Sequence, residues 1–515
     1  MYGIIGLPVD WPVLLYHHPD GGTGQARKEE FMIDRDLWFL AICAAFLLPA
    51  GRASGLFIDG SPDRVKTPLD PGMKRIGTVA LRSTREIRSS KITVGCETLD
   101  RDYTDFAAYR DYLPPLGVKK IRLQGGWAKT EKVPGVYDWK WLDEVIDFAA
   151  ANGLEPWLEA SYGNPAYAGG GGNNLLNSLM TSPEGYAAWD RWVEAMATRY
   201  QGRVREWEIW NEPDHPGQKI APETTAELNI RTAAIIKRIS PEARIAALAF
   251  ASNSNTEYLD RFLKVIFDAG KLDLFTWVSY HSYDMRPEDS YPSVARLKEV
   301  VARYSPNLLL RQGENGAPST YIPSFALAKY YWTEYTQAKY DLRRLLGDLG
   351  RDIETSVFTI IDIYYDWGKD SVLNKKGLIE ADITKAAIRP KVAYYAVQNL
   401  AAIFDDSLRP VPEFACDHDA GESLSVFGYR RAGEKTRLVT LWLDGKVPTN
   451  SFQTTPINIT VPDAGFRNPV WVDLMTGAIY EIPANRWTRK GDKISFTAIP
   501  VYDSPVLITD RDIVM

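Results

Sequence analysis

Residues 205–214, REWEIWNEPD, decide the expected fold. A strand-like run ends at Trp210, and Pro213 fixes the backbone where that strand gives way to a loop. Asn211 and Glu212 therefore stand at the carboxyl end of a strand. In parallel β/α architectures catalytic groups gather at that end, because the strands hold side chains rigidly while the loops vary. Glu212 is a candidate catalytic residue, the alternative being an ordinary surface carboxylate.

Short apolar runs alternate with amphipathic helical patterns through residues 91–404. Seven such runs accompany the one at Arg205, and they begin at Lys91, Lys119, Leu154, Arg244, Leu274, Leu308 and Val357. Eight strands separated by helices predict an α/β fold, a closed (β/α)8 TIM barrel. An open doubly wound sheet would usually carry a glycine-rich phosphate turn, and the Gly-rich run at residues 169–172 lacks that spacing. We expect this run to form a flexible loop over the barrel mouth.

The pattern changes at the C-terminal end of the barrel. Residues 405–515 consist of short alternating runs broken by Gly, Pro and Asp, which predicts an all-β sandwich domain. The N-terminal segment, residues 54–90, contains FIDG and GTVALRST, which also have strand patterns. These two strands could join the sandwich.

Residues 1–53 are interpreted as an upstream extension and a secretory signal peptide. An apolar run over residues 37–48 precedes Pro49 and a small-x-small site at residues 51–53. The run has 12 residues, fewer than the about 20 that a membrane span needs. We therefore expect a secreted or periplasmic protein without stable membrane insertion after signal cleavage.

Composition bears on whether the protein binds nucleic acid, a metal ion or a cofactor. Charged residues make up 24% of the chain and the formal net charge is −6, which argues against nucleic acid. The five histidines form no ligand spacing with the three cysteines, so we expect no metal, and nothing in the sequence calls for an organic cofactor. The oligomeric state is left open.

A second carboxylate follows the run at Leu308, which reads LLLRQGENG. Glu314 stands at the carboxyl end of this predicted seventh strand, so it would point into the same mouth as Glu212. Glycoside hydrolysis requires two carboxylates across the scissile bond, one protonated and one ionised. The alternative for Glu314 is a salt-bridging carboxylate beside Arg311.

The pairing of WNEP at the fourth strand with a glutamate at the seventh resembles the retaining glycoside hydrolases of clan A, over residues 91–404. EIWNEPD together with the later YHSY segment is most similar to family 39, the group of β-xylosidases and α-L-iduronidases. The resemblance implies that Glu212 is the acid/base, Glu314 the nucleophile and Asn211 the donor to the sugar 2-hydroxyl.

Further site residues follow from the same resemblance. Arg122 on the second strand matches the arginine that keeps the nucleophile ionised, and His281 and Tyr283 match the pair on the sixth strand. Gln124 is a departure, because many family members have histidine there. The GENG context of the nucleophile is closer to glycoside hydrolase family 1.

Three other residues that follow strands are candidates for substrate binding. They are Trp367, Trp127 and Asn164. Trp367 is predicted to end the eighth strand, and the resemblance implies that its ring lies under the sugar. Packing in the core or at the barrel rim is the alternative for each of them.

The sequence thus predicts a secreted retaining hydrolase that acts on an oligo- or polysaccharide. A non-catalytic carbohydrate-binding barrel and an exo-acting β-xylosidase- or iduronidase-like enzyme are the alternatives, and scarce histidine disfavours a lyase or a metal-dependent hydrolase. The loop at residues 162–176 contains the run of four glycines at 169–172, and we expect it to lack the bulky residues of a tight pocket wall, which favours a cleft that cuts chains internally.

Overall fold

The computed structural model describes residues 64–176 and 179–515, so the predicted signal peptide and the FIDG strand lie outside the described residues. Its central feature is an eight-stranded parallel sheet in the order β8-β7-β6-β5-β4-β3-β2-β9. The strands are β2 (Ile92–Gly95), β3 (Lys120–Gln124), β4 (Glu155–Ala160), β5 (Glu206–Ile209), β6 (Arg244–Phe250), β7 (Trp277–His281), β8 (Leu309–Glu314) and β9 (Thr355–Val357). A parallel bridge between Arg311 and Glu354 joins the two ends of the sheet. The predicted TIM barrel is confirmed.

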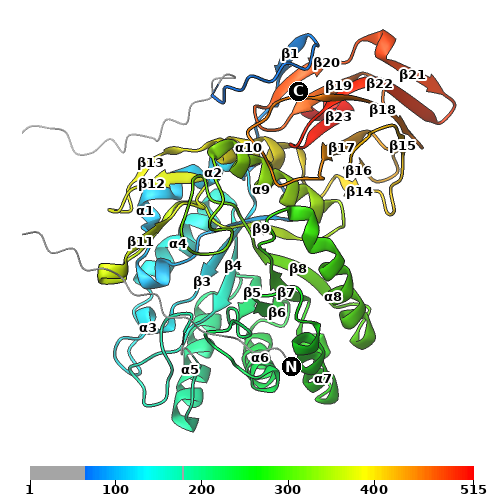
Figure 1. Cartoon of the computed structure of the whole chain (residues 1–515). Helices are drawn as coiled ribbons and strands as arrows, with labels where there is room; N and C mark the ends of the chain where they lie inside the picture. Colours follow the sequence, from blue (N-terminus) through cyan, green and yellow to red (C-terminus); the bar gives the residue numbers. More distant parts are fainter. Residues whose placement is uncertain (1–63, 177–178) are drawn as a thin grey trace, which may run out of the picture. The chain divides into compact units, whose positions relative to one another are not determined.

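Helices surround the strands on the outside (Figure 1). The longer ones are α4 (Lys140–Asn152), α5 (Pro183–Arg199), α6 (Pro222–Ile239), α7 (Thr256–Asp268), α8 (Tyr291–Tyr304), α9 (Glu334–Leu349) and α10 (Val392–Ile403). The spacing of apolar residues in α4 explains why one side of this helix packs inward, because Leu142, Val145 and Ile146 share its buried face. Gly153, at φ 72°, ends the helix in the left-handed conformation that glycine adopts easily.

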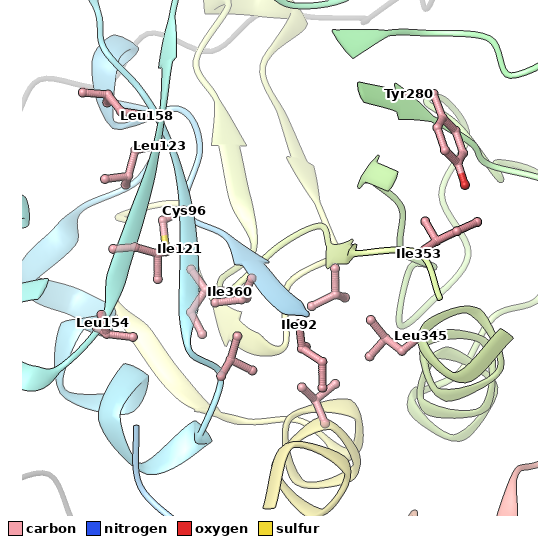
Figure 2. Packing of buried hydrophobic residues seen from close by; sticks show 14 of the residues in the cluster. Ile92, Cys96, Ile121, Leu123, Leu154, Leu158, Tyr280, Leu345, Ile353 and Ile360 are labelled. Atoms are coloured by element: carbon pink, nitrogen blue, oxygen red, sulfur yellow. The ribbon is translucent and has the colours of Figure 1, made fainter. Parts of the chain in front are cut away.

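The barrel and its helices share one apolar core. Figure 2 shows Ile92 and Ile121 of the strands together with Leu345 of α9, and all three are fully buried. Burying a side chain of this size contributes about 1.5–3 kcal/mol relative to leaving it exposed. This packing fixes the strand ends, and therefore fixes any side chain at the barrel mouth.

The eighth strand is shorter than predicted. It ends at Val357, and the apolar run that continues to Trp367 leaves the barrel. There β10 (Ile363–Tyr365) pairs antiparallel with β11 (Val372–Asn374), followed by the hairpin of β12 (Ile379–Ala381) and β13 (Ala387–Pro390). Trp367 therefore does not end a barrel strand, because the backbone reverses outside the sheet.

The C-terminal region forms two antiparallel sheets, in the orders β1-β20-β19-β23-β17-β16-β14 and β15-β18-β22-β21. Their strands are β14 (Arg409–Pro410), β15 (Asp417–His418), β16 (Leu424–Arg430), β17 (Leu438–Leu443), β18 (Thr455–Val461), β19 (Pro469–Asp473), β20 (Ala478–Glu481), β21 (Trp487–Lys490), β22 (Lys493–Val501) and β23 (Val506–Asp510). The first sheet includes β1 (Arg75–Thr78), which starts two residues before the predicted GTVALRST strand and pairs with β20. Among the described helices, none has the length and apolar character that a membrane span requires.

Candidate active site

Glu212 follows β5 in a sharply turned segment. Trp210 and Glu212 both have positive φ, 65° and 49°, which is uncommon for residues other than glycine and tends to occur at functional sites. Backbone hydrogen bonds to the neighbouring strands hold the turn, from Trp210 N–H to Ala160 O at 3.0 Å and from Glu212 N–H to Ala249 O at 2.8 Å. The Glu212 side chain therefore leaves a rigid base.

Glu314 ends β8, where its Cα is the register partner of His281 on β7. The hydroxyl of Tyr283 donates to Glu314 Oε1 at 2.6 Å, and the Arg122 guanidinium donates to Oε2 at 3.2 Å. A carboxyl oxygen of Glu212, one of Glu314 and a ring nitrogen of His281 all lie within 4.8 Å of one another. The two carboxyl groups thus face each other across a short gap.

His281 lies between the two glutamates. Its Nδ1 is 2.8 Å from Glu212 Oε1 and 3.6 Å from Glu314 Oε2, and the ring is fully buried. Burial alone would lower the pKa of His281, but the Glu314 charge and the hydrogen bond with Glu212 raise it to about 9. The two carboxyl groups therefore favour the protonated form of the imidazole.

Glu314 is held in its ionised form. Burial opposes ionisation, yet the charges of His281 and Arg122 and the hydrogen bond from Tyr283 outweigh it, so the pKa of Glu314 lies below its ordinary value. An ionised carboxylate aimed into a gap beside a second carboxyl group can act as a nucleophile.

Arg122 is the buried centre of a larger charge cluster. Besides Glu314, its guanidinium contacts the carboxylates of Glu97, Glu159 and Glu208. The Arg122 side chain is fully buried. Burial raises the pKa of Glu97 to about 7 and that of Glu159 to about 8, although the Arg122 charge opposes both shifts. One guanidinium therefore supports several carboxyl groups, and some of these are protonated near neutral pH.

A cavity of about 530 Å³ opens over the two glutamates, within the usual range of small-molecule sites. Its lining comes from several βα loops and comprises Glu97, Thr98, Arg101, Tyr103, Gln124, Tyr162, Asn174, Leu175, Leu176, Asn211, Glu212, His215, Glu314, Phe325, Phe358, Tyr365 and Trp367. Ligand sites of TIM barrels occupy this same end of the barrel.

Most of this barrel matches the model of a known protein family. The family described as Glycosyl hydrolases family 39 matches residues 93–343, a span that runs from β2 into α9 and contains both glutamates. Residues 93–343 of this chain are thus similar to the family 39 glycoside hydrolases, the family that the sequence motifs resemble.

The curated relatives match in part. A β-xylosidase of Caldicellulosiruptor saccharolyticus is 27% identical over 234 residues, 43% of this chain and 45% of the relative. The β-galactosidase BgaA of Clostridium cellulovorans is 33% identical over 122 residues, 19% of this chain and 18% of the relative. The matches thus span less than half the length of either relative.

Solved structures share the fold of this family 39-like chain. A family 39 glycoside hydrolase from Bacteroides cellulosilyticus WH2 aligns over 84% of this chain and 83% of its own, with 17% identity and a TM-score of 0.60. A β-xylosidase from Caulobacter crescentus CB15 aligns over 85% and 98%, with 18% identity and a TM-score of 0.55.

The family 39-like barrel brings most of the predicted site residues together. Asn211 accepts a hydrogen bond from Arg122 at 3.0 Å and donates to the Tyr162 hydroxyl at 2.9 Å. Gln124 accepts from Arg101 at 2.5 Å and from the Thr98 amide at 3.3 Å. Both residues line the cavity.

Trp367 lines the cavity although it is not on a barrel strand. Its ring stacks on Tyr365 at 5.0 Å, and its indole N–H donates to the Tyr103 hydroxyl at 3.2 Å. The side chain remains 49% exposed, so one face of the ring is open to a ligand. Phe325 lies beside the pair, and the three aromatic residues form one wall of the mouth.

Trp127 and Asn164 do not line the cavity. The Trp127 ring is fully buried against Trp192, and its indole N–H donates to Glu131 at 2.6 Å. Asn164 is 1% exposed and donates to the Glu131 carbonyl at 2.8 Å. Both side chains are turned toward the packing around Glu131, so neither is available to a sugar, and the predicted substrate contacts are corrected to supporting roles.

Part of the Gly-rich run is closely packed. The Gly170 carbonyl accepts a hydrogen bond from the Asn164 amide, and the Gly170 amide donates one to the Tyr167 carbonyl. A Cβ at Gly170 would lie 2.2 Å from Asn164 O. Gly170 therefore lies in a tightly packed turn at the base of the loop. Leu175 and Leu176, farther along the loop, reach the cavity and form a second wall.

Several cavity residues were missed by the sequence analysis. Glu97, Arg101 and Tyr103 come from the loop after β2, and His215, three residues after Glu212, also lines the cavity. Glu97 ends the predicted first strand, KITVGCE, so the same rule that selected Glu212 and Glu314 could have found it.

Proposed function

We propose that the protein is a retaining glycoside hydrolase that removes a terminal β-linked sugar from an oligo- or polysaccharide. The observation that carries this proposal is the spacing of Glu212 and Glu314, which have carboxyl oxygens within 4.8 Å of each other. Retaining enzymes hold their carboxyl groups about 5–5.5 Å apart, whereas inverting enzymes need about 6.5–9.5 Å for an intervening water.

In the proposed reaction Glu314 attacks the anomeric carbon while Glu212 gives a proton to the departing oxygen, and the glycosidic bond breaks. The proton comes from the His281–Glu212 pair, whose 2.8 Å hydrogen bond carries one proton whichever residue holds it. Water then loses a proton to Glu212 and attacks the glycosyl ester of Glu314 from the same face. The sugar leaves with its original anomeric configuration.

Terminal cleavage is favoured by the shape of the mouth. Leu175 and Leu176 bound the cavity on one loop, and Phe325 and Trp367 bound it on others. Bulky side chains at the mouth suit a pocket for a chain end better than an open groove. The relatives' names, a β-xylosidase and a β-galactosidase, support a β-linked substrate.

We also propose that the chain is secreted, on the strength of the apolar run and small-residue site before residue 54. Amino-terminal sequencing of the protein recovered from the native host's medium tests this. A start within residues 1–36 would contradict signal cleavage.

The catalytic assignment is tested with aryl β-xylosides and β-galactosides. Glu314→Ala should abolish hydrolysis, and azide should restore activity with formation of a glycosyl azide, because the small anion enters the vacated space. Glu212→Ala should retain far more activity on glycosides with activated leaving groups than on natural ones. The exposed Glu299 on α8 provides the control variant, Glu299→Ala.

Three results would contradict the proposal. Inverted configuration in the first product by proton NMR would exclude the retaining mechanism. Tight binding of a glycan without turnover would favour the non-catalytic carbohydrate-binding barrel. Mid-size fragments as early products from a defined oligosaccharide would show internal cleavage instead of terminal cleavage.

A further inference from the structure

Lys376 is a buried lysine that the proposed reaction does not use. It lies in the turn between β11 and β12 and is 2% exposed. Its ammonium group donates to the carbonyl of Gly316 at 3.2 Å and lies 4.2 Å from the centroid of the Tyr283 ring. Burying an ammonium group is costly, so its retention at this position calls for a reason.

The groups around Lys376 lead directly to Glu314. Tyr283, whose ring meets the ammonium group, donates its hydroxyl to Glu314 at 2.6 Å. Gly316 is two residues beyond Glu314 in the same turn. The charges of Glu314 and Asp341 are the ones that act on Lys376.

Asp341 is the other carboxyl group facing this lysine. It is fully buried on α9 and accepts from the Ala317 amide at 3.2 Å. Burial raises the pKa of Asp341 well above its ordinary value, which favours its neutral form. Glu314, whose pKa is lowered, is therefore the ionised partner of Lys376.

We propose that Lys376 is a positioning residue for Glu314. Its ammonium group holds the Tyr283 ring in place by a cation–π contact and puts a positive charge behind the Glu314 carboxylate. Because it depends on Glu314 being the nucleophile, this inference rests on the proposed function. Arg122 and His281 approach Glu314 from β3 and β7, and Lys376 adds a third cation from outside the barrel sheet.

The charge has a consequence at each step of the reaction. A nearby cation favours the ionised carboxylate, which lowers the pKa of Glu314 and makes it a better leaving group when the glycosyl ester is hydrolysed. Burial lowers the pKa of Lys376 to about 7, although Glu314 and Asp341 oppose this. The cation is present on the acid side of neutrality and is lost as the pH rises through 7.

The test compares Lys376→Met and Lys376→Gln with the parent enzyme. Glutamine can still donate to the Gly316 carbonyl but has no charge, so it separates the charge from the hydrogen bond. Lys375→Met is the matched control, since the Lys375 ammonium group pairs with Asp362 at 3.3 Å and does not reach Tyr283.

The first readout is the pKa of Glu314 in the free protein, from ¹³C NMR of side-chain-labelled glutamate assigned with Glu314→Gln. Both Lys376 variants should raise it by about one unit, and Lys375→Met should leave it unchanged. This measurement needs no substrate, so it separates failure of this inference from failure of the proposed function.

The second readout is the acid limb of the kcat/KM profile, which should move to higher pH by the same amount in both Lys376 variants. An unchanged Glu314 pKa in Lys376→Gln would overturn the role of the charge. A parent-like profile in Lys376→Met would overturn it equally. Failure of both variants to fold would assign Lys376 a purely structural role and would also overturn the proposal.

Discussion

Arg122→Met should destabilise the protein by an amount that depends strongly on pH. The guanidinium is fully buried and pairs with Glu97, Glu159, Glu208 and Glu314. Removing one member of a buried ion pair costs about 3–5 kcal/mol, because the partner charge is left uncompensated. The cost is limited by protonation, since a carboxylate in this cluster can take up a proton instead.

The pH dependence follows from that limit. Neutralising one carboxyl group with an ordinary pKa of 4.5 costs about 4 kcal/mol at pH 7.5 and about 0.7 kcal/mol at pH 5. We therefore expect a loss of about 3–5 kcal/mol at pH 7.5 and about 1–2 kcal/mol at pH 5. With an unfolding entropy of about 2.1 cal/mol/K per residue over about 450 residues, the loss at pH 7.5 lowers the Tm by about 3–5 °C.

Urea unfolding and differential scanning calorimetry at the two pH values provide the measurement. Arg203→Met is the control, because Arg203 pairs with Asp147 at the surface, where the side chains are 36% and 66% exposed, and should lose less than about 1 kcal/mol. An equal loss at both pH values would show that the Arg122 variant acts through packing. A loss as small as that of the control would refute the reasoning altogether.

Two predictions concern the cavity walls. In Gly217→Ala the new Cβ would lie 2.1 Å from Leu176 Cδ2, so Leu176 must shift, and KM should rise several-fold with little change in kcat. Gly421→Ala is the control, because its new Cβ meets no atom within 4 Å. An unchanged KM in Gly217→Ala would contradict the assignment of Leu176 to the wall. Trp367→Ala should lower kcat/KM by about 5- to 30-fold, equivalent to about 1–2 kcal/mol of lost stacking, whereas Tyr331→Ala, 82% exposed, should have no effect. Equal effects of the two aromatic variants would argue against a sugar contact at Trp367.

The meeting of the two glutamates could be anticipated because it depends on one rule. Glu212 and Glu314 each follow a buried apolar run, and the carboxyl ends of parallel strands share one edge of the barrel. That rule needs no knowledge of individual contacts. It applies equally to Glu97, which ends the run of β2 and was overlooked because no motif marked it.

The same rule was insufficient where the chain turns after the strand. Trp127 follows β3 but enters the short helix α3 (Trp127–Thr130) at once, and this rotates its ring onto Trp192 and away from the mouth. Trp367 arrives at the mouth by a different route, through the hairpin of β10 and β11. Periodicity cannot distinguish a barrel strand from an apolar hairpin that continues the same run.

The different roles proposed for the two glutamates depend on contacts that no local pattern contains. Four side chains lower the pKa of the buried Glu314, and they come from β7, β3, the segment after β7 and the turn after β11: His281, Arg122, Tyr283 and Lys376. Within residues 64–176 and 179–515, no lysine or arginine forms an ion pair with Glu212, which meets His281 alone. A carboxyl group beside several cations stays ionised, whereas one that shares a proton with a histidine can deliver that proton. The proposed asymmetry between nucleophile and acid therefore depends on the tertiary placement of these side chains and not on the two glutamate motifs themselves.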